Sequence, residues 1–156
     1  MKLLKFNEFF DYNDSRETKR KNKQTFEPKN KLIDIKQLLK IHDDLIENYG
    51  GVYGIRDEDQ LESVILKPYM SAFGQYIYPT FFEKVAALLE AIVVNHPMAD
   101  GNKRTGFYTA EWVLKDNGYK LDISYDEARP VIVDIISGDK EVSEVTDWLK
   151  ENSSKI

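Results

Sequence analysis

Apolar residues recur at intervals of three and four along most of the chain, which is the pattern of amphipathic helices. The clearest run lies between Leu32 and Tyr49, and the glycine pair Gly50-Gly51 then ends it. We therefore predict a first helix over residues 32–49. Its inward face would carry Leu32, Ile35, Leu38, Leu39, His42, Leu45, Ile46 and Tyr49.

Start and stop signals mark the later helices. Asp57 can cap a second helix that Pro68 ends, and Thr80 can cap a long third helix. The third helix is apolar nearly all round, so we expect it at the centre of the fold. Further helices are predicted over 102–116, 124–138 and 143–152, with a short extended piece over 119–123. The fold class is therefore all-α.

One segment interrupts this helical pattern. Residues 67–79 contain four aromatic residues, two prolines and one glycine, which predicts an irregular segment or a hairpin flap just before the central helix. Its aromatic residues, Tyr69, Phe73, Tyr76 and Tyr78, have two competing interpretations. They either pack against the domain or form a docking surface for a partner.

The chain divides into an N-terminal extension (1–30), a domain (31–152) and a tail (153–156). Met1–Tyr12 has roughly helical apolar spacing, and residues 13–30 are polar, as in a linker. The extension carries eight basic and five acidic residues, a net charge of +3, which leaves −8 for the remainder. It could dock on the domain, serve as a removable address or a partner-binding arm, or be a frayed end.

Composition excludes several classes of function. A chain of 156 residues corresponds to about one domain. Cysteine is absent, which rules out disulfides, thiolate nucleophiles and Cys-ligated metal centres. The net charge of −5 argues against nucleic acid as a partner. There is neither a membrane-length apolar run nor a secretory-type leader, so we expect a cytoplasmic protein without membrane contact.

Candidate chemistry is concentrated in His96-Pro97-Met98-Ala99-Asp100-Gly101-Asn102-Lys103-Arg104-Thr105-Gly106, between the central helix and the next. The free N–H groups at a helix start favour an anion, and Gly101 allows close backbone approach. Lys103 and Arg104 add the point charge and the planar fork that suit phosphates. Asp100 offers oxygen ligands for Mg²⁺, and an imidazole such as that of His96 ordinarily titrates near neutrality, as a general base should.

On the residues alone, a simpler interpretation remains open. A histidine after an apolar helix is usually structural, and a run such as DGNKR is usually a polar turn. The joint occurrence of a base, a carboxylate, a glycine and paired cations favours a site, but spacing alone does not decide between the two.

The same stretch resembles the signature of the Fic/Doc superfamily, whose pattern is H-x-F-x-D/E-G/A-N-x-R. The death-on-curing (Doc) branch reads H-x-F-x-D-A/G-N-K-R-T, which HPMADGNKRT matches apart from Met98. The flanks IHDDLIENYGGVYGIRDEDQLESVI and YPTFFEKVAALLEAIVVNHP, and DNGYKL downstream, are similar to Doc-like proteins in order and spacing. The resemblance covers about residues 33–150.

This resemblance implies a compact Fic/Doc helical fold and a role for each motif residue. His96 would be the general base that deprotonates a protein hydroxyl, and Asp100 would bind Mg²⁺. The residues implied to hold the nucleotide's phosphates are Gly101, Asn102, Lys103 and Arg104, the last two also as catalytic groups. Residues 67–79 would be the flap that aligns a target segment. Met98 stands where the family usually has Phe, and we expect it to replace that inward anchor at modest cost.

The branch decides the predicted reaction. The AMP-transferring branch has Gly where this chain has Lys103, and a second Arg where it has Phe107. The resemblance therefore favours a Doc-like toxin that moves phosphate from ATP, with Mg²⁺, to a Ser/Thr hydroxyl of a protein such as elongation factor Tu. It also implies an antitoxin partner and a bacterial cell, with a phage or other mobile element as a conceivable carrier. The alternatives are protein AMPylation and a catalytically silent nucleotide- or antitoxin-binding module.

Other polar residues have ordinary interpretations. His42 lies on an apolar helix face and is predicted to be a satisfied core histidine rather than a second catalytic one. Arg56, beside Asp57, is predicted to help cap a helix, although it could reach a partner. Trp112 and Trp148 are predicted to pack in the core.

Overall fold

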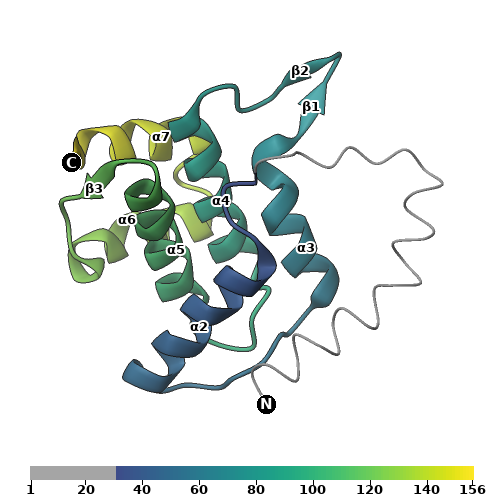
Figure 1. The fold of residues 1–156 in the computed structure, drawn as a ribbon, viewed down its shortest axis with the longest axis vertical. Helices are drawn as coiled ribbons and strands as arrows, with labels where there is room; N and C mark the ends of the chain where they lie inside the picture. The colour runs from purple at the N-terminus through teal and green to yellow at the C-terminus, as the bar shows by residue number, and fades with distance from the viewer. Residues whose placement is uncertain (1–30) are drawn as a thin grey trace.

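A computed structural model describes residues 31–156 of the chain (Figure 1). The predicted extension, residues 1–30, lies outside the described residues, and so do its predicted helix and linker. The described part is mainly helical, as predicted. Its helices are α2 (Ile35–Tyr49), α3 (Glu58–Leu66), α4 (Phe81–Asn95), α5 (Asn102–Asp116), α6 (Tyr125–Ser137) and α7 (Val142–Glu151), with a 3-10 turn η1 (Lys67–Tyr69) after α3.

Side-chain caps fix where most helices begin. Asp34 accepts the Gln37 N–H at the start of α2, and Asp57 accepts the N–H groups of Asp59 and Gln60 at the start of α3. Thr80 and Glu83 form a reciprocal capping box at α4, and Ser124 caps α6. The starts predicted at Asp57, Thr80 and Ser124 are thus confirmed. Each depends on a hydrogen bond between residues two or three positions apart, which the local sequence is enough to predict.

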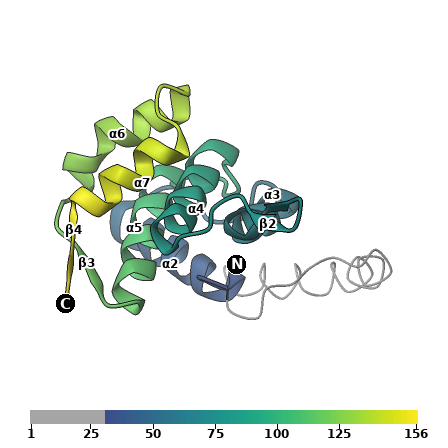
Figure 2. The same ribbon diagram turned by 90° about the horizontal axis from the view of Figure 1, so that it is seen from above.

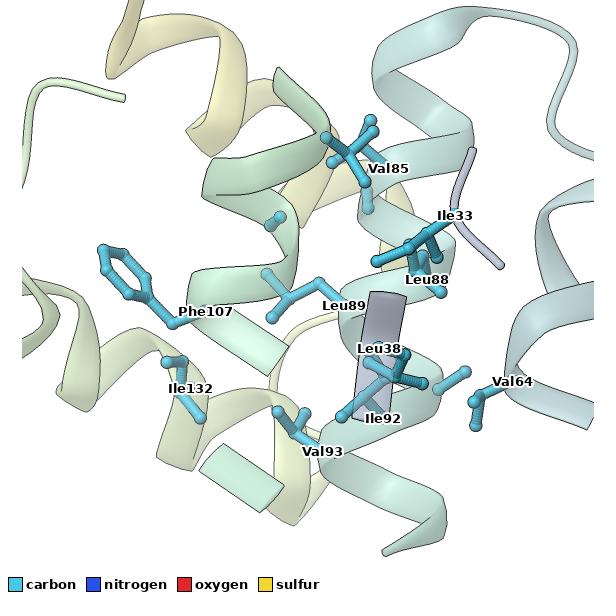
Figure 3. Packing of buried hydrophobic residues seen from close by; sticks show 14 of the residues in the cluster. Ile33, Leu38, Val64, Val85, Leu88, Leu89, Ile92, Val93, Phe107 and Ile132 are labelled. Atoms are coloured by element: carbon cyan, nitrogen blue, oxygen red, sulfur yellow. The ribbon is translucent and has the colours of Figure 1, made fainter. Parts of the chain in front are cut away.

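Helix α4 lies at the centre of the fold, as its nearly uniform apolar composition predicts (Figures 1 and 2). Its residues 85–89 and 91–93 are buried, and they pack against α5, α7, α3 and α6. Figure 3 shows Leu89, Ile92 and Val93 of α4 between Phe107 of α5 and Ile132 of α6 on one side and Val64 of α3 on the other. Trp112 and Trp148 are partly buried and pack against this core.

Two short antiparallel strand pairs accompany the helices. β1 (Ser71–Ala72) and β2 (Gln75–Tyr76) form the hairpin predicted before the central helix. β3 (Tyr119–Leu121) pairs with β4 (Ser153–Lys155). The sequence predicts an extended piece at β3 but only a tail at 153–156, because no local pattern in Ser-Ser-Lys-Ile identifies a partner strand 32–36 positions earlier in the chain.

No helix within residues 31–156 is both long enough and apolar enough to cross a membrane.

Candidate active site

The predicted site residues line one cleft, of about 430 Å³, at the junction of α2, α5 and α6. His96 lies at the end of α4, and Asp100 to Arg104 form the loop and the first turn of α5. The structure thus brings together every residue proposed from the sequence as catalytic or phosphate-binding. The lining comprises Leu45, Ile46, Tyr49, Gly50, His96, Ala99, Asp100, Gly101, Asn102, Lys103, Arg104, Tyr125, Asp126 and Arg129.

His96 has a left-handed backbone, with φ 48° and ψ 59°, at the C-cap of α4. Helices commonly end in this conformation, but glycine is the usual residue because a side chain there is strained. Such strain costs about 1–3 kcal/mol and persists only where surrounding contacts enforce it. The conformation turns the chain sharply out of α4 and leaves the His96 side chain exposed in the cleft.

Arg56 enforces this turn. Its Nε donates to the carbonyl of His96 at 2.6 Å, and its Nη2 donates to the carbonyl of Asn95 at 2.7 Å. The backbone of the same segment also binds the loop, since Arg56 N–H donates to the Pro97 carbonyl and Ala99 N–H to the Gly54 carbonyl. Of the group Arg56, Asp57 and Glu58 that was predicted to cap a helix, Asp57 caps α3 as expected, whereas Arg56 bonds instead to the carbonyls at the end of α4.

We expect Arg56→Ala to slow turnover by about ten- to a hundredfold, with a smaller change in nucleotide affinity. The reason is that His96 would relax from its strained turn, and a displacement of about 1 Å can cost a hundredfold in rate. Initial rates and nucleotide titrations on the same protein measure the two effects. Lys36→Ala, an exposed substitution on α2, is the control. A loss of affinity as large as the loss of turnover would contradict this positioning role.

Met98 anchors the His96 loop by packing into the core, as predicted. Only 1% of its surface is exposed, and its backbone pairs with Ile55 in a single antiparallel bridge. Asn102 completes the anchor, because its side chain accepts the Met98 N–H and donates to the Met98 carbonyl, both at 3.0 Å. In this structure the Asn102 side chain therefore braces the loop, and its backbone N–H is the part that belongs to the helix start.

Asp100 is held by two backbone amides. Its Oδ1 accepts the N–H of Gly101 at 2.8 Å, and its Oδ2 accepts the N–H of Val52 at 3.1 Å. A Cβ on Gly51 would lie 2.7 Å from Oδ2, so only glycine lets the 50–52 segment pass this closely. One carboxylate with spare lone pairs beside a phosphate site fits Mg²⁺, which usually takes one or two carboxylates plus substrate oxygens. Within residues 31–156 no cluster of three potential ligands offers an all-protein metal cage.

The start of α5 is open toward the cleft. Its N-cap is Gly101, with φ 74°, and no side chain caps the first turn. The amides of Asn102, Lys103 and Arg104 are therefore available, and the helix dipole adds partial positive charge at the same place. A Cβ on Gly101 would lie 3.3 Å from Ile46 Cδ1, so a larger residue would also crowd the wall. This is the anion-binding arrangement that the sequence predicts.

The two cations of the motif differ in their surroundings. Lys103 is exposed, whereas the Arg104 guanidinium carbon lies 4.2 Å from the ring centroid of Tyr49 and 4.6 Å from that of Tyr125. Tyr49 was predicted on the inward face of the first helix, but 56% of its surface is exposed. That prediction is wrong because Tyr49 is the last residue of α2, where the helix already extends past the core toward the cleft.

His42 is a buried core histidine, as predicted, but it is only partly satisfied, because its Nδ1 has no hydrogen-bond partner within residues 31–156. None of its surface is exposed, and its Nε2 lies 2.8 Å from the carbonyl oxygen of Asp100. Burial lowers the pKa of this imidazole, so it is neutral at pH 7. His42 therefore supports the loop from the core side and has no access to the cleft.

Helix α6 supplies a wall that sequence reasoning did not find. Tyr125, Asp126 and Arg129, all in its first turns, line the cleft opposite α5. Ser124 predicted the start of α6, but no local pattern predicts that this end of the helix lies beside the loop about twenty positions earlier in the chain. Arg129 adds a third cation to the cleft, and Tyr125 adds an aromatic ring.

The hairpin lies away from the cleft. β2 leads into the first turn of α4, whereas His96 follows its last, and 15 helical residues span about 22 Å (Figure 1). The role assigned to 67–79 as a flap over the site therefore does not fit this arrangement. The segment that does run along the His96 loop is 50–57, through the Ile55–Met98 bridge and the Arg56 contacts. No local pattern predicts this pairing, because it depends on tertiary packing.

Comparison with known proteins agrees with the motif. A family model described as Fic/DOC family matches residues 32–114. The toxin Doc of Mycolicibacterium smegmatis is 31% identical over 99 residues, which cover 62% of this chain and 76% of that protein. The protein kinase doc of Escherichia phage P1 is 31% identical over 118 residues, which cover 76% of this chain and 92% of that protein. The family model matches more than half of this chain, and the alignment with the phage protein covers almost all of that protein. The chain therefore belongs to the Fic/DOC family.

Proposed function

We propose that this chain is a toxin that transfers the γ-phosphate of ATP to a Ser or Thr hydroxyl of a protein, and that elongation factor Tu is the candidate target. The observation that carries the proposal is the joint placement of His96, Asp100 and the open start of α5 in one cleft. A base, a metal-type carboxylate and an anion site are the parts that phosphoryl transfer needs.

Each side chain has a defined task in this reaction. The His96 imidazole takes the proton of the acceptor hydroxyl as its oxygen bonds to the γ-phosphorus. The bond from that phosphorus to the β,γ-bridging oxygen breaks, and ADP leaves with the electron pair. Lys103, Arg104 and the free amides of the first turn of α5 stabilise the charge on the phosphate oxygens. Phosphoryl transfer requires mainly this positioning and charge stabilisation.

Asp100 is the residue that would hold Mg²⁺. Its two oxygens keep lone pairs beyond the bonds from Gly101 and Val52, and they line the cleft beside the anion site. When bound there, the ion would neutralise part of the phosphate charge. The amide contacts fix the carboxylate, so the side chain does not have to reorient when the nucleotide arrives.

Two residues favour phosphate over AMP as the transferred group. Lys103 stands where the AMP-transferring branch has glycine, and it adds a charge at the cleft. Phe107 stands where that branch has a second arginine, and Phe107 is buried, so this position contributes no cation to the cleft. The name of the phage relative, protein kinase doc, supports the same choice.

Radioactive ATP tests the proposal directly. We expect transfer of label from γ-³²P-ATP, and none from α-³²P-ATP, to a protein of a bacterial lysate and to purified elongation factor Tu. Label from α-³²P-ATP would mean nucleotidyl transfer instead. ATP binding without any labelled product would mean a silent binding module. Induced expression should arrest bacterial growth, and co-expression of an antitoxin that covers the cleft should relieve the arrest.

We expect Asp100→Asn to weaken binding of ATP in Mg²⁺ and to lower the rate by more than about a hundredfold, because the amide offers the cation no charge. Binding of ATP in EDTA should change less, since the α5 amides remain. Calorimetry with and without Mg²⁺ measures the difference. Asp116→Asn, at the exposed far end of α5, is the matched control. Equal losses with and without Mg²⁺ would contradict a metal-binding role.

A further inference from the structure

We infer that Tyr49 and Tyr125 are positioning residues that hold the Arg104 guanidinium ready for a polyphosphate chain before the ligand arrives. The identity of the ligand rests on the proposed function. The arrangement of the three residues does not, because it is present in the structure of the chain alone.

The three side chains come from separate elements. Tyr49 is the last residue of α2, Arg104 lies in the first turn of α5, and Tyr125 is the first residue of α6. The guanidinium carbon lies 4.2 and 4.6 Å from the two ring centroids, within the range of cation–π attraction. The cleft is the place where these three helix ends meet.

The rings are themselves fixed by neighbours on α5. The Tyr49 side chain interacts with that of Tyr108, one helical turn after Arg104. This interaction and burial raise the pKa of Tyr108 to about 12, so its phenol remains protonated at physiological pH. The ring of Tyr108 stacks on Tyr125 at 6.3 Å, and Phe107 meets Tyr125 edge to face at 5.7 Å. The buried Tyr125 ring therefore has little freedom to move, whereas the exposed Tyr49 ring is restrained through Tyr108 and Arg104.

Contacts of this kind restrain an arginine without using its hydrogen-bond donors. Within the described residues the Arg104 side chain has no hydrogen bond and no ion pair, so its five N–H donors remain for phosphate oxygens. An arginine that is already ordered loses less conformational entropy on binding than a free one. The rings should therefore add to the affinity for a polyphosphate without touching it.

Binding measurements on ring variants test this inference. We expect Tyr49→Leu to weaken binding of tripolyphosphate by about three- to thirtyfold, the range of one cation–π contact. Tyr49→Phe keeps the ring and should recover most of that loss. Tyr49 is largely exposed, so its replacement should not unfold the chain. Tyr125→Leu and Tyr125→Phe form a second pair, with melting temperatures measured because Tyr125 is buried.

The hairpin provides a matched control. The ring of Tyr76 lies under the Lys84 ammonium at 4.2 Å, the same distance as in the Tyr49–Arg104 contact, but at the opposite end of α4 from His96. Tyr76→Leu removes a comparable cation–π contact outside the cleft. It should leave tripolyphosphate binding within twofold of the unaltered chain.

A double-mutant cycle shows whether the rings act through Arg104. In an Arg104→Gln background, Tyr49→Leu should weaken tripolyphosphate binding by less than twofold, because the residue it positions is gone. In the ligand-free chain, the Arg104 Nε–H resonance should carry a ring-current shift that Tyr49→Leu reduces and Tyr49→Phe retains.

Several results would overturn the inference. One is an undiminished effect of Tyr49→Leu in the Arg104→Gln background. A second is weaker binding of ATP together with unchanged binding of tripolyphosphate, which would mean that Tyr49 contacts the adenosine part of ATP. A third is tighter binding in the Leu variants, which would mean that the rings sequester Arg104. The proposed function fails separately: if the coupling is present but no γ-label is transferred, the positioning role stands and the kinase assignment does not.

Discussion

His96→Ala should yield a folded chain that still binds ATP but transfers phosphate at least about a hundredfold more slowly. A positioned general base contributes roughly 10²–10⁴-fold to such a step, and His96 is the only imidazole lining the cleft of the described residues. The anion site is built from α5, so its amides and cations are untouched by the change. Single-turnover rates with γ-³²P-ATP, together with ATP titrations, separate the two effects.

The control for this variant lies on the same helix. Val94→Ala removes an exposed side chain two positions before His96, and turnover should stay within twofold of the unaltered chain. If His96→Ala reduced ATP affinity as strongly as turnover, His96 would be a binding residue rather than the base. If turnover survived, the proposed mechanism would be wrong.

Gly106→Ala should reduce the free energy of unfolding by about 1–3 kcal/mol, the usual cost of overpacking a close-packed core. Gly106 lies in the second turn of α5, where that helix meets α4, and a Cβ there would lie 2.5 Å from Val93 Cγ1 and 3.1 Å from Leu89 Cδ1. Valine is branched at Cβ and cannot turn its methyl groups away without a change of rotamer. Thermal denaturation should show a melting temperature lower by several degrees.

The direction of this effect is the informative part. In an unobstructed helix, alanine in place of glycine adds about 1 kcal/mol of stability, so steric crowding and helix propensity predict opposite signs. Lys115→Ala, at an exposed position of the same helix, should change stability by only a few tenths of a kcal/mol. A Gly106→Ala chain that melts higher than the original would show that α4 and α5 can separate freely.

Local signals in the sequence predicted the helices well. The apolar periodicity and the capping residues Asp57, Thr80 and Ser124 act within one or two turns, so reading them needs no knowledge of the fold. The site motif is equally local, because His96 to Arg104 are nearly consecutive and the structure only has to turn the chain once. The buried position of His42 follows from the same periodicity, and that of Met98 was implied by the family resemblance.

What the sequence did not predict depends on pairs of residues far apart in the chain. Arg56 reaches the end of α4 across 40 positions, and Tyr125 meets Arg104 across 21. The pairing of β3 with β4 is of the same kind. No local pattern encodes such contacts, since they arise only when the helices pack. The hairpin lies before α4 as predicted, but its assigned role at the site does not fit, because His96 lies at the other end of α4.

The burial of His42 makes the stability of the fold depend on pH. Because burial lowers the pKa of this imidazole below its usual 6.5, the folded chain binds fewer protons at this residue than the unfolded chain does. The free energy of unfolding is therefore highest above the unfolded pKa of His42. It declines as the pH falls through and below 6.5, well above the range where ordinary carboxylates titrate. Mild acidification therefore lowers the free energy of unfolding through His42, the residue that binds the Asp100 carbonyl, before ordinary carboxylates titrate.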